Sequence, residues 1–313
     1  MTGPDATCSD GSLAAGEPLA GTSPYALSWV ALEQNGPWGA RAFTDSHLDP
    51  GVGKAIEDLA ATHDVRPSLI RRPGHHADAA SGHESGRHVL VAHTRPGRTW
   101  LLAGRVARPE ELLATDWAAL RDGDLEGVRR SLPTLEPSTD AHLLVCTNGK
   151  RDVCCAVKGR PVAVGVAPRH PGRVWEVTHT SGHRFAPTAV LLPAGTLHGR
   201  LDVTSAEQLL TVAAEGATVL EGSRGRSTWP APAQAAELAV RETIGVLGLD
   251  ALEITGHDAT GERSWSTRVH HVDGRSWEVQ VEARESEALR AESCGKALKP
   301  MTWFTRTTEE CDR

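Results

Sequence analysis

Long apolar runs are absent from this chain. Among its 313 residues, no stretch approaches the roughly 18 consecutive apolar residues that a membrane-spanning helix needs. The first residues, Met1 to Ala6, also lack the basic segment and apolar run that together mark a signal peptide. We therefore expect a protein without a membrane span or an export signal, with the cytoplasm as its compartment.

Lysine and cysteine are scarce as well. Of the 33 basic residues only five are lysine, and the net charge is -7 at pH 7, which argues against broad binding to nucleic acid. The basic character comes from arginine, whose planar guanidinium is suited to forked contacts with anions. Six cysteines are too few to form a disulfide scaffold in a chain of this length. We interpret them as metal ligands, redox groups or core residues.

The expected secondary structure repeats along the chain. Each repeat runs strand, helix, three strands, helix, as judged from apolar periodicity and turn residues. The first set lies at residues 28–33, 52–63, 68–71, 88–93, 99–103 and 109–120. The second set lies at 142–146, 152–166, 174–178, 189–192, 197–201 and 205–214. We expect the 152–166 helix to be loosened or divided near Gly159 and Pro161, and the last helix to be capped by Thr204 or Ser205.

This order predicts an α/β fold with two thioredoxin-like units, because each set has a strand, a crossover helix and then adjacent strands. The shared order indicates a divergent duplication. We predict an N-terminal thioredoxin-like unit at 1–138, with an irregular lead-in over 1–25, and a second unit at 139–222. A C-terminal α+β extension at 223–313 contains a helix at 233–247 and a β-hairpin, and its polar end is expected to be mobile.

Reactive side chains concentrate between residues 146 and 187. Cys146 ends a predicted strand, at the carboxyl edge where sites collect in α/β folds. Asp152 is a plausible cap of the following helix, which places Cys154 and Cys155 in its first turn, where the helix dipole favours thiolates. Cys146 and Cys155 can then face one point, whereas Cys154 points about 100° away along the helix.

His179 and His183 complete a possible ligand set. The residues before them predict a strand that runs into a loop, and Gly182 lets that loop curl so that both imidazoles reach one centre. Two thiolates and two neutral imidazoles suit zinc, and they equally suit a 2Fe–2S cluster with both imidazoles on one iron. Reaction of the thiols themselves, or four core residues without a ligand, are the remaining alternatives.

Several uncommon words of this sequence resemble, in order, those of the sucrase/ferredoxin-like family, the thioredoxin-like ferredoxins. They span most of the chain: Glu17-Pro-Leu-Ala-Gly-Thr22, Glu33-Gln-Asn-Gly-Pro-Trp-Gly39, Leu69-Ile-Arg-Arg-Pro-Gly74, Cys146-Thr-Asn-Gly-Lys-Arg-Asp-Val-Cys-Cys155, His179 to Pro187, Pro230 to Ala236 and Ser293-Cys-Gly-Lys296. The family often has histidine where Asn148 stands and glycine where Ser181 stands, but neither is a ligand position.

The resemblance implies that residues 139–222 form a thioredoxin-like ferredoxin unit with a 2Fe–2S cluster. Its ligands would be Cys146, Cys155, His179 and His183, with Cys154 as an alternative ligand. Arg151, Asp152 and Arg184 flank these ligands and are expected to tune their charge or to help a partner dock. Cys8, Cys294 and Cys311 have no assigned role, although Cys294 lies in one of the family-like words.

We therefore expect an iron–sulfur protein that transfers electrons or senses redox state, with a redox protein or reductase as partner. A zinc-stabilised thioredoxin-like binding module is the first alternative. An enzyme that reduces a small molecule through the cluster or a thiol is the second. The word sucrase finds no support, because no paired carboxylates are placed for glycoside hydrolysis. The N-terminal unit has no cysteine at the matching strand end, Glu33 to Gly36, and is expected to carry no cluster.

Overall fold

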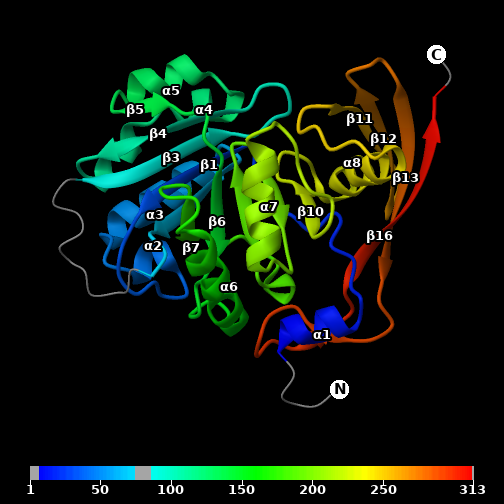
Figure 1. Ribbon diagram of the computed structural model, residues 1–313, viewed down its shortest axis with the longest axis horizontal. Helices are drawn as coiled ribbons and strands as arrows, with labels where there is room; N and C mark the ends of the chain where they lie inside the picture. Colours follow the sequence, from blue (N-terminus) through cyan, green and yellow to red (C-terminus); the bar gives the residue numbers. More distant parts are fainter. Residues whose placement is uncertain (1–6, 75–85, 312–313) are drawn as a thin grey trace.

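A computed structural model describes residues 7–74 and 86–311, and Figure 1 shows their arrangement. A long mixed sheet runs through two thirds of the chain, with helices packed against it. A second, antiparallel sheet with its own helix, α8, lies at one end of the molecule. This arrangement confirms the α/β fold class.

Ten strands form the long sheet, in the order β10-β9-β8-β6-β7-β2-β1-β3-β4-β5. They are β1 (Ser28–Glu33), β2 (Val65–Arg71), β3 (Arg87–His93), β4 (Trp100–Val106), β5 (Leu135–Pro137), β6 (His142–Cys146), β7 (Val174–Val177), β8 (Ala189–Leu192), β9 (Thr196–His198) and β10 (Ser223–Arg226).

The two sets of strands pair in the same way. β1 pairs in parallel with β2 and antiparallel with β3, and β6 does the same with β7 and β8. The two halves join where β2 and β7 run antiparallel, with Ile70 opposite Val177. Both halves therefore share one continuous sheet, and the carboxyl end of β6 lies near the seam between them.

Helices and 3₁₀ turns pack around both large sheets. They are α1 (Cys8–Ala14), α2 (Ala42–Asp45), α3 (Pro50–Ala61), η2 (Pro109–Ala114), α4 (Trp117–Asp122), α5 (Leu125–Ser131), α6 (Val153–Val166), η3 (His183–Phe185), α7 (Val203–Ala213) and α8 (Ala231–Ile244).

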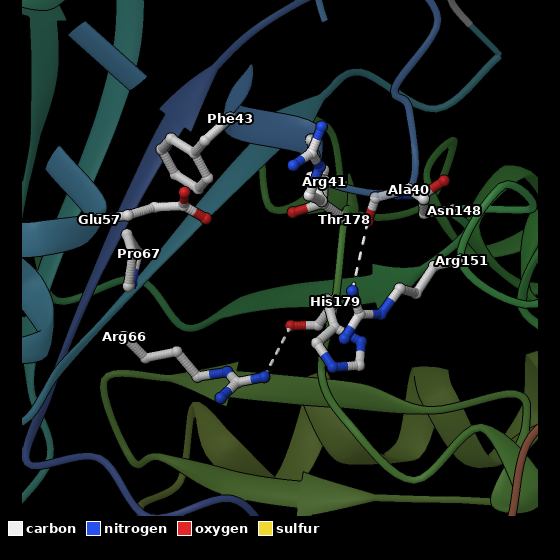
Figure 2. Close-up of a pocket in the computed structure, with 11 residues that line it drawn as sticks. Ala40, Arg41, Phe43, Glu57, Arg66, Pro67, Asn148, Arg151, Thr178 and His179 are labelled. Carbon is white, nitrogen blue, oxygen red and sulfur yellow. Dashed lines mark hydrogen bonds between the residues drawn. The ribbon is translucent and has the colours of Figure 1, made fainter. Parts of the chain in front are cut away.

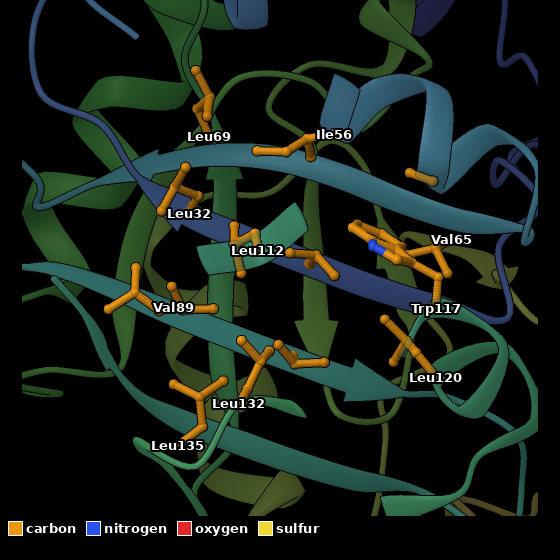
Figure 3. Close-up of a cluster of buried hydrophobic side chains, with 14 of the residues drawn as sticks. Leu32, Ile56, Val65, Leu69, Val89, Leu112, Trp117, Leu120, Leu132 and Leu135 are labelled. Atoms are coloured by element: carbon orange, nitrogen blue, oxygen red, sulfur yellow. The ribbon is translucent and has the colours of Figure 1, made fainter. Parts of the chain in front are cut away.

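Alternating strand residues supply three apolar clusters. One packs α3, η2 and α4 against the N-terminal half, with Leu32 and Ile56 among its members (Figure 3). A second packs α6 and α7 against the other half. The third combines residues of both halves, including Trp29 of β1, Trp175 of β7 and Cys146 of β6. Because side chains alternate along a strand, Cys146 points into the cluster that both halves share.

The C-terminal extension is larger than the predicted hairpin. Its sheet contains β11 (Leu252–Gly261), β12 (Ser264–His271), β13 (Ser276–Glu285) and β16 (Thr302–Glu310), in that order, with α8 packed against it. Two short strands, β14 (Arg290–Ala291) and β15 (Leu298–Lys299), lie between β13 and β16. β16 pairs along β13 as far as Glu310. The expectation of a mobile end concerns the last residues of the chain, of which 312 and 313 lie outside the described part.

Three local predictions near the site are also wrong. Residues 8–14 form helix α1 rather than an irregular lead-in, because the Thr7 hydroxyl accepts a hydrogen bond from the Asp10 amide and caps it. Helix α6 is not divided at Pro161, whose ring lies on the exposed face. The cap of α7 is Asp202, which accepts a hydrogen bond from Ser205 N at 2.7 Å.

The predicted 109–120 helix is divided into η2 and α4. The Asp116 carboxylate starts the second helix, because it caps α4 by accepting a hydrogen bond from Ala119 N at 2.9 Å.

None of the helices within 7–74 and 86–311 is long and apolar enough to cross a bilayer.

Candidate metal centre

Cys146 is fixed by the strand that it ends. Its amide donates to Thr188 O at 2.8 Å, and its side chain is 1% exposed. Helix α6 crosses close to this strand end because Gly159 has no Cβ, and a Cβ there would collide with the Cys146 carbonyl oxygen. The close approach brings the start of α6 beside Cys146.

Cys155 lies in the first turn of α6, as predicted. Asp152 caps this helix by accepting a hydrogen bond from Cys154 N at 2.9 Å, which confirms its predicted role as cap. The Cys155 sulfur lies 3.3 Å from Nδ1 of His183. Cys154 points away from the histidines, and its sulfur contacts those of Cys8 and Cys294 instead.

The two histidines lie on the loop that follows β7. Ser181 and Gly182 between them have φ angles of 61° and 68°, and these left-handed residues curl the chain as predicted. The two imidazole rings therefore stack with their centroids 4.9 Å apart. Nδ1 of His179 is buried without a hydrogen-bond partner in the structure. A buried nitrogen in that state is free to bind a metal.

The electrostatics of Cys146, His179 and His183 favour metal-binding forms, whereas those of Cys155 favour the thiol. Interactions with Cys155, and then with His179, hold the pKa of Cys146 well below its ordinary value despite burial. The pKa of Cys155 is raised, first by its hydrogen bond to Cys146 and then by burial. Burial lowers the pKa of both His179 and His183, so both rings are neutral at pH 7. Neutral imidazole is the form that ligates metals.

Two arginines that the sequence analysis did not single out hold the histidine loop. Arg224 of β10 is fully buried and donates to Thr180 O at 3.3 Å and to Ser181 O at 3.1 Å. Arg66 of β2 donates to Ser181 Oγ at 3.1 Å. It also donates to His179 O at 3.5 Å, as Figure 2 shows. The signal in the sequence is the Arg-Gly-Arg segment at 224–226, whose two arginines become buried once β10 pairs with β9.

The predicted flanking residues have identifiable contacts. Arg151 donates to Ala40 O at 3.4 Å, across the seam between the two halves (Figure 2). Arg184 donates to Glu17 Oε1 at 2.6 Å and lies over the Phe185 ring.

Desolvation lowers the pKa of the fully buried Arg224 to about 9, so it still carries a positive charge at pH 7.

A cavity of about 340 Å³ opens beside His179. Arg41, Arg66 and Arg151 line it together with His179, as Figure 2 shows. Glu57 is the acidic side chain among its lining residues, and burial raises the pKa of that carboxyl. The cavity therefore offers mainly cationic groups to whatever approaches His179.

Among the described residues, one group of possible metal ligands has its ligand atoms close together, and it is not the predicted set of Cys146, Cys155, His179 and His183. Cys8, Asp152, Cys154 and Cys294 have ligand atoms that all lie within 4.8 Å of one another. The Cys8 thiol donates toward Cys154, and this hydrogen bond lowers the pKa of Cys154 to about 5. Cys8 and Cys294 stand 286 positions apart, and no local spacing pattern connects them. Cys311 is outside both groups, because its backbone amide continues the pairing next to β13.

Comparison with known proteins gives one match. No curated protein and no solved structure matches the chain. The model of the sucrase/ferredoxin-like family matches residues 19–225, which include β6, α6, the histidine loop and β10 as far as Gly225. Because the match covers well over half of the sequence, this chain belongs to the sucrase/ferredoxin-like family.

Proposed function

We propose that the protein binds a 2Fe–2S cluster through Cys146, Cys155, His179 and His183, and that it transfers single electrons or senses redox state. The observation that carries the proposal is the buried Nδ1 of His179, which has no hydrogen-bond partner and belongs to a ring that lowers the pKa of Cys146. Two thiolates and two neutral imidazoles are a known ligand set for such a cluster.

The cluster, when bound, would supply a carrier for one electron at a time. The protein's own residues determine how much water reaches the site and how much positive charge surrounds it. Cys146 and Cys155 are each 1% exposed, so water is kept from the sulfurs. Arg224 and Arg66 hold the histidine loop and place positive charge near the thiolates, and such charges raise a reduction potential by favouring the added electron.

Electrons would pass through the side of the site that faces the cavity. His179 lines that cavity, whereas both cysteines are buried beneath it. Arg41, Arg66 and Arg151 surround the same opening, so an acidic surface of a redox protein or reductase is the complementary partner.

The cavity also favours a second candidate function, the reduction of a small anionic molecule beside His179. Its volume of about 340 Å³ is that of a small ligand site. Reoxidation of the reduced protein distinguishes the two functions. A small-molecule reductase would be reoxidised by its substrate alone, whereas an electron carrier would need its protein partner.

The deciding experiment is anaerobic purification followed by counts of iron, acid-labile sulfide and zinc. We expect about two irons and two sulfides per chain and a red-brown colour that dithionite bleaches. His179→Ala and Cys155→Ser should abolish or shift this spectrum, and Cys311→Ser serves as the matched control with an unchanged spectrum. A colourless protein that retains one zinc through His179 would overturn the proposal in favour of a zinc-stabilised module.

A further inference from the structure

Three cysteine sulfurs from distant parts of the chain meet at the start of α6. Cys8 belongs to α1, Cys154 to α6, and Cys294 to the segment between β14 and β15. Their sulfurs form a nearly equilateral triangle, with Cys8–Cys154 at 3.6 Å, Cys154–Cys294 at 3.3 Å and Cys294–Cys8 at 3.5 Å. All three cysteines are free thiols in the structure.

Asp152 supplies a fourth possible ligand. Its Oδ2 lies 3.6 Å from the Cys8 sulfur and accepts hydrogen bonds from Ser293 Oγ and Cys294 N, which occupy both lone pairs of that oxygen. Its Oδ1 accepts a hydrogen bond from Cys154 N at 2.9 Å and a long one from the Cys8 thiol at 3.9 Å, whose proton leaves when the sulfur binds a metal. A lone pair on Oδ1 is therefore available to a cation.

We propose that Cys8, Cys154, Cys294 and Asp152 form a structural Zn²⁺ site, separate from the cysteine–histidine centre. Tetrahedral zinc with zinc–sulfur bonds of about 2.3 Å places its thiolates about 3.8 Å apart. The observed triangle is smaller by only a few tenths of an ångström. Binding requires no oxidant, because each thiol that is protonated releases a proton to solvent as its sulfur binds the ion.

The arrangement of three sulfurs favours a metal over a disulfide. A disulfide joins two sulfurs and leaves the third cysteine unused, but Cys8, Cys154 and Cys294 are nearly equidistant. Four protein ligands and no open position are typical of structural rather than catalytic zinc. Cys8, Asp152 and Cys154 are each less than a tenth exposed, so the site is closed to solvent on the α6 side.

The position of this site indicates which parts of the chain the metal would hold together. Figure 1 shows α1 and the chain that follows β13 side by side beneath α6, and α1 packs against both β14 and η3. His183 is the first residue of η3, and Cys155 directly follows Cys154. Zinc would therefore join two distant segments to the start of α6 and hold them against the cysteine–histidine centre.

The test is to count zinc and iron in the same samples of the full chain, purified anaerobically from Zn²⁺-supplemented medium. We expect Cys8→Ser and Cys294→Ser each to lose one zinc per chain relative to the unsubstituted protein, with iron and sulfide unchanged. Cys311→Ser is the matched control and should lose neither metal. Because the two metals are counted separately, failure of the iron–sulfur proposal would not hide the result for zinc.

Three results would overturn the zinc site. The first is a zinc count that does not differ between Cys294→Ser and Cys311→Ser. The second is a mass lower by two hydrogens that reduction restores, which would show a disulfide. The third is loss of iron together with zinc in Cys8→Ser while circular dichroism shows an intact fold, because the thiols would then belong to the cluster.

A measurement on the unsubstituted protein covers the case in which these variants do not fold. A thiol-reactive mercurial should release one zinc per chain to a colorimetric chelator, and chelation should lower the melting temperature. Absence of zinc release would contradict the proposal without any substitution.

Discussion

At the scale of single residues, the loop that carries the histidines depends on backbone conformations that few side chains tolerate. Ser181 and Gly182 both have positive φ angles, which strain the backbone of a residue with a side chain such as Ser181. A hydrogen bond that Ser181 accepts from Arg66 offsets part of this strain. The family's frequent glycine at position 181 agrees with this geometry, because glycine adopts the left-handed region without strain.

Gly182→Ala should release the cluster from the protein. An alanine there would adopt a left-handed conformation at a cost of about 1–2 kcal/mol, and its Cβ would also collide with the Arg224 guanidinium. We expect a lower free energy of unfolding and loss of most of the iron on gel filtration. Gly216→Ala is the matched control, because Gly216 has a φ of 71° but open space around it. Equal iron in both variants would show that Arg224 does not hold the loop.

A buried histidine next to the seam makes stability depend on pH. His142 of β6 accepts a hydrogen bond from the Trp175 indole at 3.3 Å, and burial lowers its pKa to about 4. Below its ordinary pKa near 6.5 the unfolded chain takes up a proton that the folded chain resists. Stability contributed by the neutral ring is thus complete above about pH 6.5 and lost as pH falls toward 4.

The measurement is the urea midpoint between pH 7 and pH 4.5. We expect a decrease worth roughly 2–3 kcal/mol from this residue, at 1.36 kcal/mol for each unit of pH. His142→Gln should remove this part of the fall in the free energy of unfolding. His47→Gln, at an exposed position, should leave the fall unchanged. The same slope in all three proteins would mean that His142 is protonated without cost.

At the scale of secondary structure elements, the site depends on how closely α6 packs on β6. Gly159 faces the Cys146 carbonyl, and any side chain there must push the helix away from the strand end. The helix carries Cys155 and the strand carries Cys146, so their distance follows from the packing of the two elements.

Gly159→Ala should therefore damage the site although it places a better helix former in a helix. Alanine is favoured over glycine by about 1 kcal/mol in a helix interior, but here its methyl would overlap the backbone. We expect net destabilisation of about 1–3 kcal/mol and reduced iron binding. Gly11→Ala in α1 is the control, because a Cβ at Gly11 meets nothing within 4 Å and the change should be neutral or stabilising. A stable Gly159→Ala variant with full iron would contradict the packing argument.

At the scale of the whole molecule, the two halves are expected to unfold together. They share one sheet through β2 and β7, and Trp175 of one half lies under the Arg72 guanidinium of the other at 3.6 Å. A fragment of residues 139–222 alone would expose the edge of β7 and lack β10 with Arg224. The division at 138/139 and 222/223 remains a prediction about evolutionary units rather than independent folding.

To check this expectation, two fragments of the chain are expressed, and their melting is followed by calorimetry. Residues 139–222 alone should give no cooperative melting transition and no iron binding, whereas residues 7–313 should show both. A fragment that melts cooperatively and retains the cluster would demonstrate an independent second domain. The longer fragment acts as the control, because it keeps both halves, β10 and all six cysteines.

Most of the order of strands and helices, the cap at Asp152, the curled histidine loop and the family could be predicted from the amino-acid sequence alone. Each of these is encoded within a few neighbouring residues, through apolar periodicity, capping side chains or glycine, and can be read without knowing the fold. The candidate ligands belong to this group, because all four lie within 38 consecutive positions.

Only the tertiary structure decided what lies around them. The joining of both halves into one sheet, the burial of Arg224 beside the histidines and the meeting of Cys8, Cys154 and Cys294 all depend on contacts between residues far apart in the chain. No local pattern records such contacts, because they form only when strands pair and helices pack. A short capped helix and a C-terminal segment thereby place two unassigned cysteines beside Cys154.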